Sequence, residues 1–197
     1  DYDGDGQVDC LLTDINGLAL YRGLGNGLFA DVPTAAGLPR NHTALQAAWA
    51  DFDNDGDADL ILGTELYQNF DGSRFVLVDS QVSGLSIGEG TGFAVEDVDR
   101  DGLLDLYLVG LDRRTSGQKW IGDNDSNQNQ LWRNRGDGTF QDITRKSGVA
   151  VREPIGVSAS FADIDNDGFP DLLVTGYGAL QLYHNQGDGT FLSLIHI

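Results

Sequence analysis

The sequence is short of cysteine, of basic residues and of long apolar runs, and each shortage excludes a class of protein. Its one cysteine, Cys10, cannot form a disulfide within the chain, which excludes a small scaffold held by cystine bridges. No apolar run approaches the roughly 18 residues of a membrane-spanning helix, so we expect no membrane insertion. The chain has 12 basic and 31 acidic residues, and its formal charge of −19 would repel nucleic acid.

Motifs for catalysis are missing as well. The sequence contains no nucleophile elbow, phosphate-binding loop or zinc-ligand spacing. Its histidines, His42, His184 and His196, are scattered, and a lone histidine is more often a surface or packing residue than a ligand. We therefore predict that the chain is not an enzyme.

What the sequence does contain is a repeat. The segments DYDGDGQVD from Asp1, DFDNDGDAD from Asp51, DVDRDGLLD from Asp97 and DIDNDGFPD from Asp163 all fit the pattern D-x-D-x-D-G-x-x-D. A second motif follows each copy in the same phase: LYRGLGNGLF, LYQNFDGSRF, LWRNRGDGTF and LYHNQGDGTF. Two motifs in register four times indicate a repeated structural unit.

Each repeat is predicted to form four strands. A stretch rich in small residues precedes the acidic loop, and a short apolar run (CLL, LIL, LYLV or LLV) follows it, as is typical of a strand buried on both faces. The Leu-aromatic pair opens a third strand, and GNG, DGS or GDG supplies the tight turn into a fourth. No segment shows sustained helical periodicity. The pattern predicts an all-β fold, a partial β-propeller of four-stranded antiparallel blades, with a β-solenoid as the alternative.

The acidic loop predicts a cation site between the first and second strands of each repeat. Side chains at positions 1, 3 and 5 of such a loop converge, glycine at position 6 permits the turn, and a hard cation takes six to eight oxygen ligands. Carboxylates this close repel one another unless a cation binds. An EF-hand is excluded, because it requires glutamate at position 12, where this chain has Leu12, Leu62, Leu108 and Val174. The last carboxylate of each loop stands at position 9 instead.

Together the two motifs resemble the FG-GAP or VCBS repeats of integrin-α-type propellers, and the second motif is similar to that of cartilage-acidic-protein-like (ASPIC/UnbV) proteins. In that family the metal is Ca²⁺, bound by side chains at positions 1, 3, 5 and 9 and by the carbonyl at position 7. The resemblance implies these side-chain ligands: Asp1, Asp3, Asp5, Asp9, Asp51, Asp53, Asp55, Asp59, Asp97, Asp99, Asp101, Asp105, Asp163, Asp165, Asp167 and Asp171. It implies carbonyl ligands from Gln7, Asp57, Leu103 and Phe169. Two departures are Gly23, where the sister repeats have Asn, and Arg100, which we expect to point outward.

The repeats divide the chain into five segments. We expect a partial blade at 1–38 with strands two to four, a blade at 39–85, a blade at 86–149 and a partial blade at 150–191. The last six residues, LSLIHI at 192–197, match the translation of a common transposase adapter, and we interpret them as an assembly scar that removes the last strand. We expect a truncated, open arc that the rest of a propeller completes in cis. Its uncapped ends are predicted to expose Val8, Leu11, Leu12, Leu172 and Val174.

One insertion, residues 112–130, interrupts the third repeat. It gathers Arg113, Arg114 and Lys119 beside Trp120, and loops of this length are usually functional or disordered. Strand alternation places it on the rim opposite the acidic loops. It is our candidate ligand-contacting loop, with a solvated insertion as the alternative.

These observations predict a calcium-stabilised module for binding or adhesion to a protein or carbohydrate ligand. Loop sites of extracellular modules bind Ca²⁺ with dissociation constants on the order of 10⁻⁴–10⁻³ M, which favours an extracellular, periplasmic or cell-surface location. The alternatives are a propeller belonging to a polysaccharide-degrading enzyme and a structural spacer.

Overall fold

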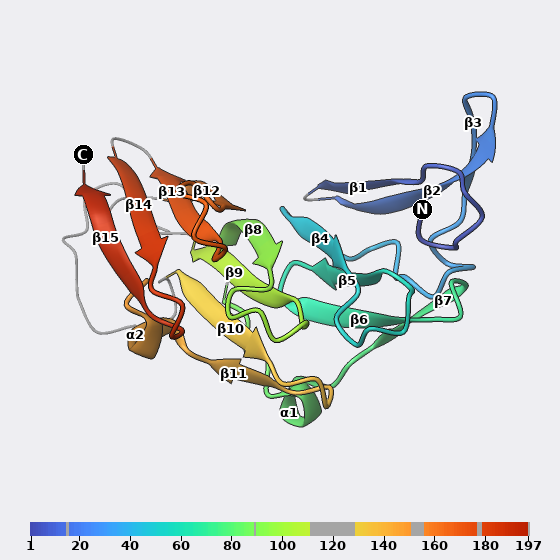
Figure 1. The fold of residues 1–197 in the computed structure, drawn as a ribbon. Coiled ribbons are helices and arrows are strands. Elements are labelled where there is room, and N and C mark those ends of the chain that lie inside the picture. The colour runs from blue at the N-terminus through green and yellow to red at the C-terminus, as the bar shows by residue number, and fades with distance from the viewer. Residues whose placement is uncertain (15, 89, 111–128, 151–155, 177–178, 197) are drawn as a thin grey trace, which may run out of the picture. The chain divides into compact units, whose positions relative to one another are not determined.

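The chain is described by a computed structural model that covers residues 1–197 except 15, 89, 111–128, 151–155, 177–178 and 197 (Figure 1). It divides into two compact units, Asp1–Ser83 and Gly84–Ile197. Each unit contains two sheets, and within every sheet the strands pair antiparallel in chain order. The prediction of an all-β fold of antiparallel repeats is therefore confirmed.

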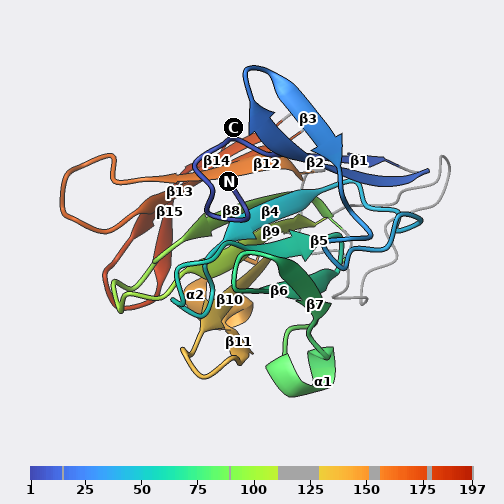
Figure 2. The same cartoon turned by 90° about the vertical axis from the view of Figure 1, so that its right-hand side faces the viewer.

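The first compact unit combines a three-stranded and a four-stranded sheet. The three-stranded sheet consists of β1 (Cys10–Asp14), β2 (Gly17–Gly25) and β3 (Leu28–Asp31). The other consists of β4 (Ala47–Ala50), β5 (Asp59–Leu62), β6 (Glu65–Phe70) and β7 (Arg74–Leu77), which lie side by side in Figure 2.

The second compact unit contains two four-stranded sheets. The first has β8 (Gly90–Glu96), β9 (Asp105–Gly110), β10 (Gln130–Asn134) and β11 (Phe140–Asp142). The second has β12 (Gly156–Ala162), β13 (Asp171–Gly176), β14 (Ala179–Asn185) and β15 (Phe191–His196).

Two one-turn helices, α1 (Ser80–Ser83) and α2 (Thr144–Ser147), follow the fourth strands β7 and β11. Each is preceded by an aspartate that accepts a hydrogen bond from the backbone two residues later, from Gln81 to Asp79 at 2.8 Å and from Thr144 to Asp142 at 2.9 Å. A single turn is too short to produce helical periodicity, so the sequence pattern does not show it. Neither helix in the described ranges is long and apolar enough to cross a membrane.

The second strands form the centre of each core. Leu60, Ile61 and Leu62 in β5 are fully buried, as are all residues from Leu106 to Val109 in β9. The prediction that the short apolar runs are strands buried on both faces is confirmed for these two strands. In the first compact unit, β5 packs with Leu20 and Phe75. In the second, β9 packs with Leu131 and Leu172.

A repeated glycine contact holds the segment that precedes a sheet against the fourth strand of that sheet. The glycine of the AGL, SGL and SGV segments lies against the phenylalanine that opens a following fourth strand. A Cβ on Gly37, Gly84 or Gly148 would lie 2.5, 3.2 or 3.1 Å from the carbonyl oxygen of Phe75, Phe140 or Phe191. A side chain at Gly37 would collide with this carbonyl oxygen, and one at Gly84 or Gly148 would require it to move by a few tenths of an ångström.

The C-terminal segment corrects one prediction. We expected the fourth repeat to lack its last strand, yet β15 pairs with β14 from Asn185↔Phe191 to Gln181↔His196. The segment 192–196 contains no glycine or proline and is mostly apolar, so it can extend a strand whatever its origin. Its interpretation as an adapter-encoded scar, and the open arc, stay predictions.

The predicted exposed residues are only partly right. Val8 is 78% and Leu12 is 55% exposed, as expected. Leu172 and Val174 are buried, and Leu11 packs against the core of the first unit, so these three predictions are wrong. Successive side chains of a strand point to opposite faces, and in β13 Leu172 and Val174 share the face turned to the core, whereas Leu173 does not.

Candidate metal centres

Four acidic loops, numbered 1 (residues 1–9), 2 (51–59), 3 (97–105) and 4 (163–171), share one backbone conformation. In each, the N–H of the glycine at position 6 donates to the carboxylate at position 1, at 2.8–3.0 Å. The N–H at position 7 donates to the carboxylate at position 5, at 2.8–3.0 Å. Positive φ at the glycines, 82° at Gly6 and 97° at Gly56, makes the turn possible.

This conformation brings the predicted side-chain ligands together. Ligand atoms of three carboxylates lie within 4.8 Å of one another in every loop: Asp1, Asp3 and Asp5; Asp51, Asp53 and Asp59; Asp97, Asp99 and Asp101; Asp163, Asp165 and Asp171. The position-9 carboxylate takes part in loops 2 and 4. Such a set of oxygen donors suits a hard divalent cation.

The aspartate at position 9 also holds the loop to the sheet. In loop 2, Asp59 accepts a hydrogen bond of 3.0 Å from the N–H of Phe52 and one of 2.8 Å from the N–H of Asn69 in β6. Asp105 bonds in the same way to Val98 and Asn134. Asp9 and Asp171 repeat the pattern. This carboxylate, at the start of the second strand, therefore connects the acidic loop to the third strand.

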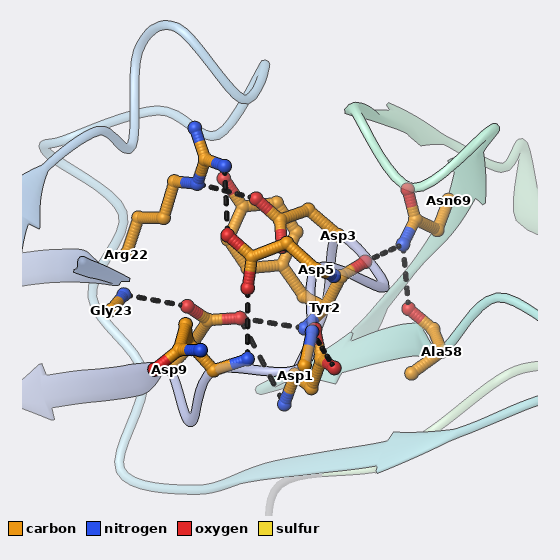
Figure 3. A network of polar contacts seen from close by, with 11 residues as sticks. Asp1, Tyr2, Asp3, Asp5, Asp9, Arg22, Gly23, Ala58 and Asn69 are labelled. Atoms are coloured by element: carbon orange, nitrogen blue, oxygen red, sulfur yellow. Dashed lines mark hydrogen bonds and ion pairs between the residues drawn. The ribbon is translucent and has the colours of Figure 1, made fainter. Parts of the chain in front are cut away.

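A third-strand side chain reaches back over each acidic loop, which the sequence analysis missed. It is the residue after the Leu-aromatic pair: Arg22, Gln68, Arg133 or His184. Figure 3 shows Arg22 extended toward Asp3 and Asp5. Its Nε lies 2.5 Å from Asp3 and its Nη2 2.8 Å from Asp5. The repeating position of this residue in the motif was the available signal.

The other three loops have related contacts. Arg133 bridges Asp99 and Asp101 at 2.6 and 3.0 Å. Gln68 donates to Asp53 alone. His184 Nδ1 lies 3.0 Å from Asp171 and 3.4 Å from Asp165. His184, which the sequence favours as a surface or packing residue, thus lies against two carboxylates of loop 4.

The asparagine that follows this side chain links neighbouring acidic loops within a unit. Asn69 donates to the carbonyl of Ala58 in its own loop at 3.1 Å and to that of Tyr2 in loop 1 at 2.8 Å (Figure 3). Asn185 does the same with Pro170 and Val98. Gly23 takes this place in β2, where a Cβ would collide with the carbonyl oxygen of Val8.

The position-7 residues lie beside the tight turns between the third and fourth strands. A Cβ on Gly136 would come within 2.9 Å of the Leu103 side chain, and one on Gly187 within 2.8 Å of Phe169. The acidic loops and these turns therefore share one rim, as the strand order predicts. Arg100 turns away from its own loop, with its guanidinium 5.5 Å from the Phe169 ring centre.

Burial and mutual repulsion raise the pKa of four loop carboxylates above its ordinary value. Burial is the main cause that raises the pKa of Asp59 and of Asp105 to about 7. Burial also raises the pKa of Asp53 and Asp99, and the neighbouring loop carboxylates add to it. By contrast, the hydrogen bond from Arg22 lowers the pKa of Asp5.

The residues present fit a calcium ion. The donors are oxygens, the atoms that Ca²⁺ prefers, and they converge from one short loop. In loop 3, Asp99 Oδ1 is buried and has no hydrogen-bond partner among the described residues, as expected of an atom that ligates a cation. The carbonyl ligands implied for Gln7, Asp57, Leu103 and Phe169 stay predictions.

The candidate ligand-contacting loop falls outside the described residues, including Arg113, Arg114, Lys119 and Trp120. Its base is described. Asn129 is buried, accepts a hydrogen bond of 2.9 Å from the N–H of Gly110 and donates one of 2.9 Å to the Tyr107 hydroxyl. Gly110 and Asn129 lie at the end of β9 away from loop 3, so the insertion starts and ends on the opposite rim.

Comparisons with known proteins agree with this architecture. Human cartilage acidic protein 1 is 27% identical over 203 residues, which cover 93% of this chain and 30% of that protein. The chain thus spans about a third of this relative. The structure also resembles that of an Agrocybe aegerita lectin, described as specifically recognising non-reducing terminal N-acetylglucosamine. Its TM-score is 0.57 with 20% identity, over 99% of this chain and 50% of the lectin. The pore of the Photorhabdus luminescens Tc holotoxin gives a TM-score of 0.50 and 22% identity, over 100% of this chain and 9% of that one.

The family comparison covers most of the sequence. A model of the FG-GAP-like repeat matches residues 1–62, 120–174 and 163–197. These ranges include acidic loops 1, 2 and 4 completely, together with the third-strand motifs that follow loops 1, 3 and 4. This chain belongs to the FG-GAP-like repeat family.

Proposed function

We propose that the chain is part of a calcium-stabilised β-propeller that binds a protein or glycan ligand outside the cell and has no catalytic activity. Calcium acts as a structural ion in the acidic loops, and ligand binding belongs to the opposite rim. The observation that carries the proposal is the fourfold recurrence of one loop conformation with three converging carboxylates.

Electrostatics supports the calcium role. Each acidic loop places several carboxylates within a few ångströms, and the whole chain has a formal charge of −19. Four Ca²⁺ ions would change that charge to −19 + 8 = −11. Ions that bind the folded state and not the unfolded state stabilise the fold by mass action.

The location and the ligand class rest on further arguments. Loop sites of this kind bind calcium at about 10⁻⁴–10⁻³ M in extracellular modules, concentrations that the cytosol does not reach. The lectin whose fold this chain shares recognises a terminal sugar. The insertion, whose base lies on the opposite rim, contributes Arg113, Arg114, Lys119 and Trp120, residue types that suit a glycan or an acidic protein surface.

A calcium titration of the 197-residue chain tests the metal role. We expect four sites filled at millimolar calcium or below, and the loss of one site in the Asp53→Asn variant. Asp31→Asn is the matched control, because it removes one charge from an exposed ion pair with Arg40 and should keep all four sites. Binding to an array of glycans and matrix proteins in calcium then tests the ligand class. A chain that binds no calcium refutes the proposal.

A further inference from the structure

The four acidic loops differ in the side chain that covers them. Arg22 and Arg133 each form two ion pairs, one with the aspartate at position 3 and one with that at position 5. The two arginines belong to different compact units, so the arrangement occurs twice independently. Gln68 and His184 occupy the same place over loops 2 and 4.

The arginines bind the oxygens that the backbone leaves free. In loop 1, the Oδ1 atoms of Asp3 and Asp5 accept hydrogen bonds from the N–H groups of Asp5 and Gln7. Their Oδ2 atoms pair with Arg22. The guanidinium therefore sits against the cluster of carboxylates that a cation would bind, as Figure 3 shows.

Burial indicates that these contacts differ from ordinary surface ion pairs. The side chains of Arg22 and Arg133 are both 41% exposed, whereas those of Asp3 and Asp99 are 12% and 18% exposed. Each arginine thus covers its loop from the solvent side. The planar guanidinium pairs with two carboxylates in a fork that neither glutamine nor lysine can reproduce.

The covering side chain sets the charge of each site. Loops 1 and 3 each have four ligand aspartates and one arginine, or −4 + 1 = −3. Loop 2 has four ligand aspartates and the uncharged Gln68 over them, which gives −4. Loop 4 also has four ligand aspartates, but the Arg100 guanidinium from loop 3 lies beside its Gly168 and Phe169. Calcium affinity of such loops rises with the number of negative ligands.

We propose that Arg22 and Arg133 are built-in counter-cations that compete with calcium. They hold loops 1 and 3 in shape when calcium is absent, and they make these two loops the weaker calcium sites. Loop 2, which has no cation over it, depends on calcium for its stability and fills first. The inference rests on the proposed calcium function and deepens it, since it predicts which sites respond to a fall in calcium.

The inference can be tested by removing the arginine that covers loop 1 or loop 3, and by adding an arginine at the corresponding residue over loop 2. We expect Arg22→Gln and Arg133→Gln to tighten calcium binding at the altered site about tenfold, because a positive charge a few ångströms from the ion is removed. The same variants should melt at a lower temperature than the parent in metal-free buffer. Gln68→Arg should do the opposite at loop 2, with weaker calcium binding and a higher metal-free melting temperature.

Two further variants serve as controls. Arg40→Gln makes the same chemical change in an exposed ion pair with Asp31 and should alter neither measurement. Arg22→Lys keeps the charge but loses the fork, and should fall between the parent and Arg22→Gln in calcium affinity.

The results that would contradict this inference differ from those that would contradict the proposed calcium function. If the parent chain binds calcium and the Arg→Gln variants bind it no tighter, or bind it more weakly, the inference is wrong and the calcium function stands. If the metal-free melting temperature of these variants equals that of the parent, the arginines do not hold the loops. If the parent chain binds no calcium, the proposed function fails, and the inference fails with it.

Discussion

The side-chain amide of Asn185 donates a hydrogen bond of 2.8 Å to the backbone carbonyl of Val98, which lies 87 residues earlier in the chain. Asn69 makes the corresponding bond to Tyr2 in the other compact unit. Both asparagines are fully buried, and each also bonds to a carbonyl of its own acidic loop. One amide thus fixes two neighbouring acidic loops to each other.

Replacing this asparagine should destabilise the fold. Asn185→Ala leaves the carbonyls of Val98 and Pro170 without their donor in a buried site, which costs about 1–3 kcal/mol of unfolding free energy for each unsatisfied group. Urea unfolding in calcium measures the loss. The control is Asn41→Ala, an exposed position whose substitution should change little. Equal unfolding free energies for the two variants would contradict the role assigned to Asn185.

The position-9 and position-5 aspartates should behave differently when neutralised. Asp59→Asn turns an amide nitrogen toward the backbone N–H of Phe52 or Asn69, so we expect a loss of about 2–3 kcal/mol even in chelator, and a further loss in calcium because a ligand is removed. The carboxylate of Asp55 faces solvent, and Asp55→Asn should weaken calcium binding while changing metal-free stability little. Unfolding curves in chelator and in calcium separate the two effects. Identical profiles for both variants would refute this division of roles.

The four-stranded antiparallel sheets could be predicted because each repeat carries the signals for its strands and turns. Glycine at fixed positions marks the turns, and the runs LIL and LYLV leave no polar residue for a solvent face, so buried strands followed from the sequence. The burial of Leu172 and Val174 was not predicted, because it depends on which face of β13 each side chain occupies and not only on whether the sheet is terminal.

The sequence predicts which aspartates converge in each acidic loop, but not which side chains from other strands contact them. The spacing of the aspartates shows which carboxylates converge. It does not show that Arg22 folds back over loop 1, because that contact depends on the register between β1 and β2, where Cys10 pairs with Tyr21. The link from Asn185 to Val98 spans two sheets, and no local pattern encodes such a distance.

The stability of the metal-free chain should fall as pH rises from about 5 to 8. Asp59 and Asp105 have pKa values of about 7 in the folded state, against a normal value of 3.8. A raised folded-state pKa gives stability that is complete below the unfolded pKa and is lost as pH rises through the folded pKa. Thermal melting in metal-free buffer measures the trend.

Calcium should flatten this pH dependence, because the ion favours the ionised carboxylates. The lower limit of pH 5 avoids the titration of Asp137 and Asp188, whose pKa values are lowered by their hydrogen bonds from Thr139 and Thr190. Those two groups lose their contribution only as pH falls below the normal value of 3.8. A metal-free chain that is more stable at pH 8 than at pH 5 would argue against the buried carboxylates as the cause.

The insertion at 112–130 yields a prediction about ligand binding. Trp120→Ala or Arg114→Ala should weaken binding to a protein or glycan ligand and leave calcium affinity nearly unchanged, because the base of the insertion lies on the rim opposite loop 3. Surface-immobilised ligand and calcium titration measure the two quantities on the same preparations. Unchanged ligand binding in both variants would show that the loop is a solvated insertion with no role in binding.

The most direct test of calcium as the ion that stabilises this fold is thermal melting of the 197-residue chain at neutral pH, in excess chelator and in millimolar calcium. Calcium offsets up to eight units of negative charge in the acidic loops, so we expect a large rise in melting temperature on adding calcium and its reversal by chelator. Magnesium at the same concentration should act more weakly, because it dehydrates reluctantly and demands stricter geometry. Equal melting temperatures in chelator and in calcium would contradict the account.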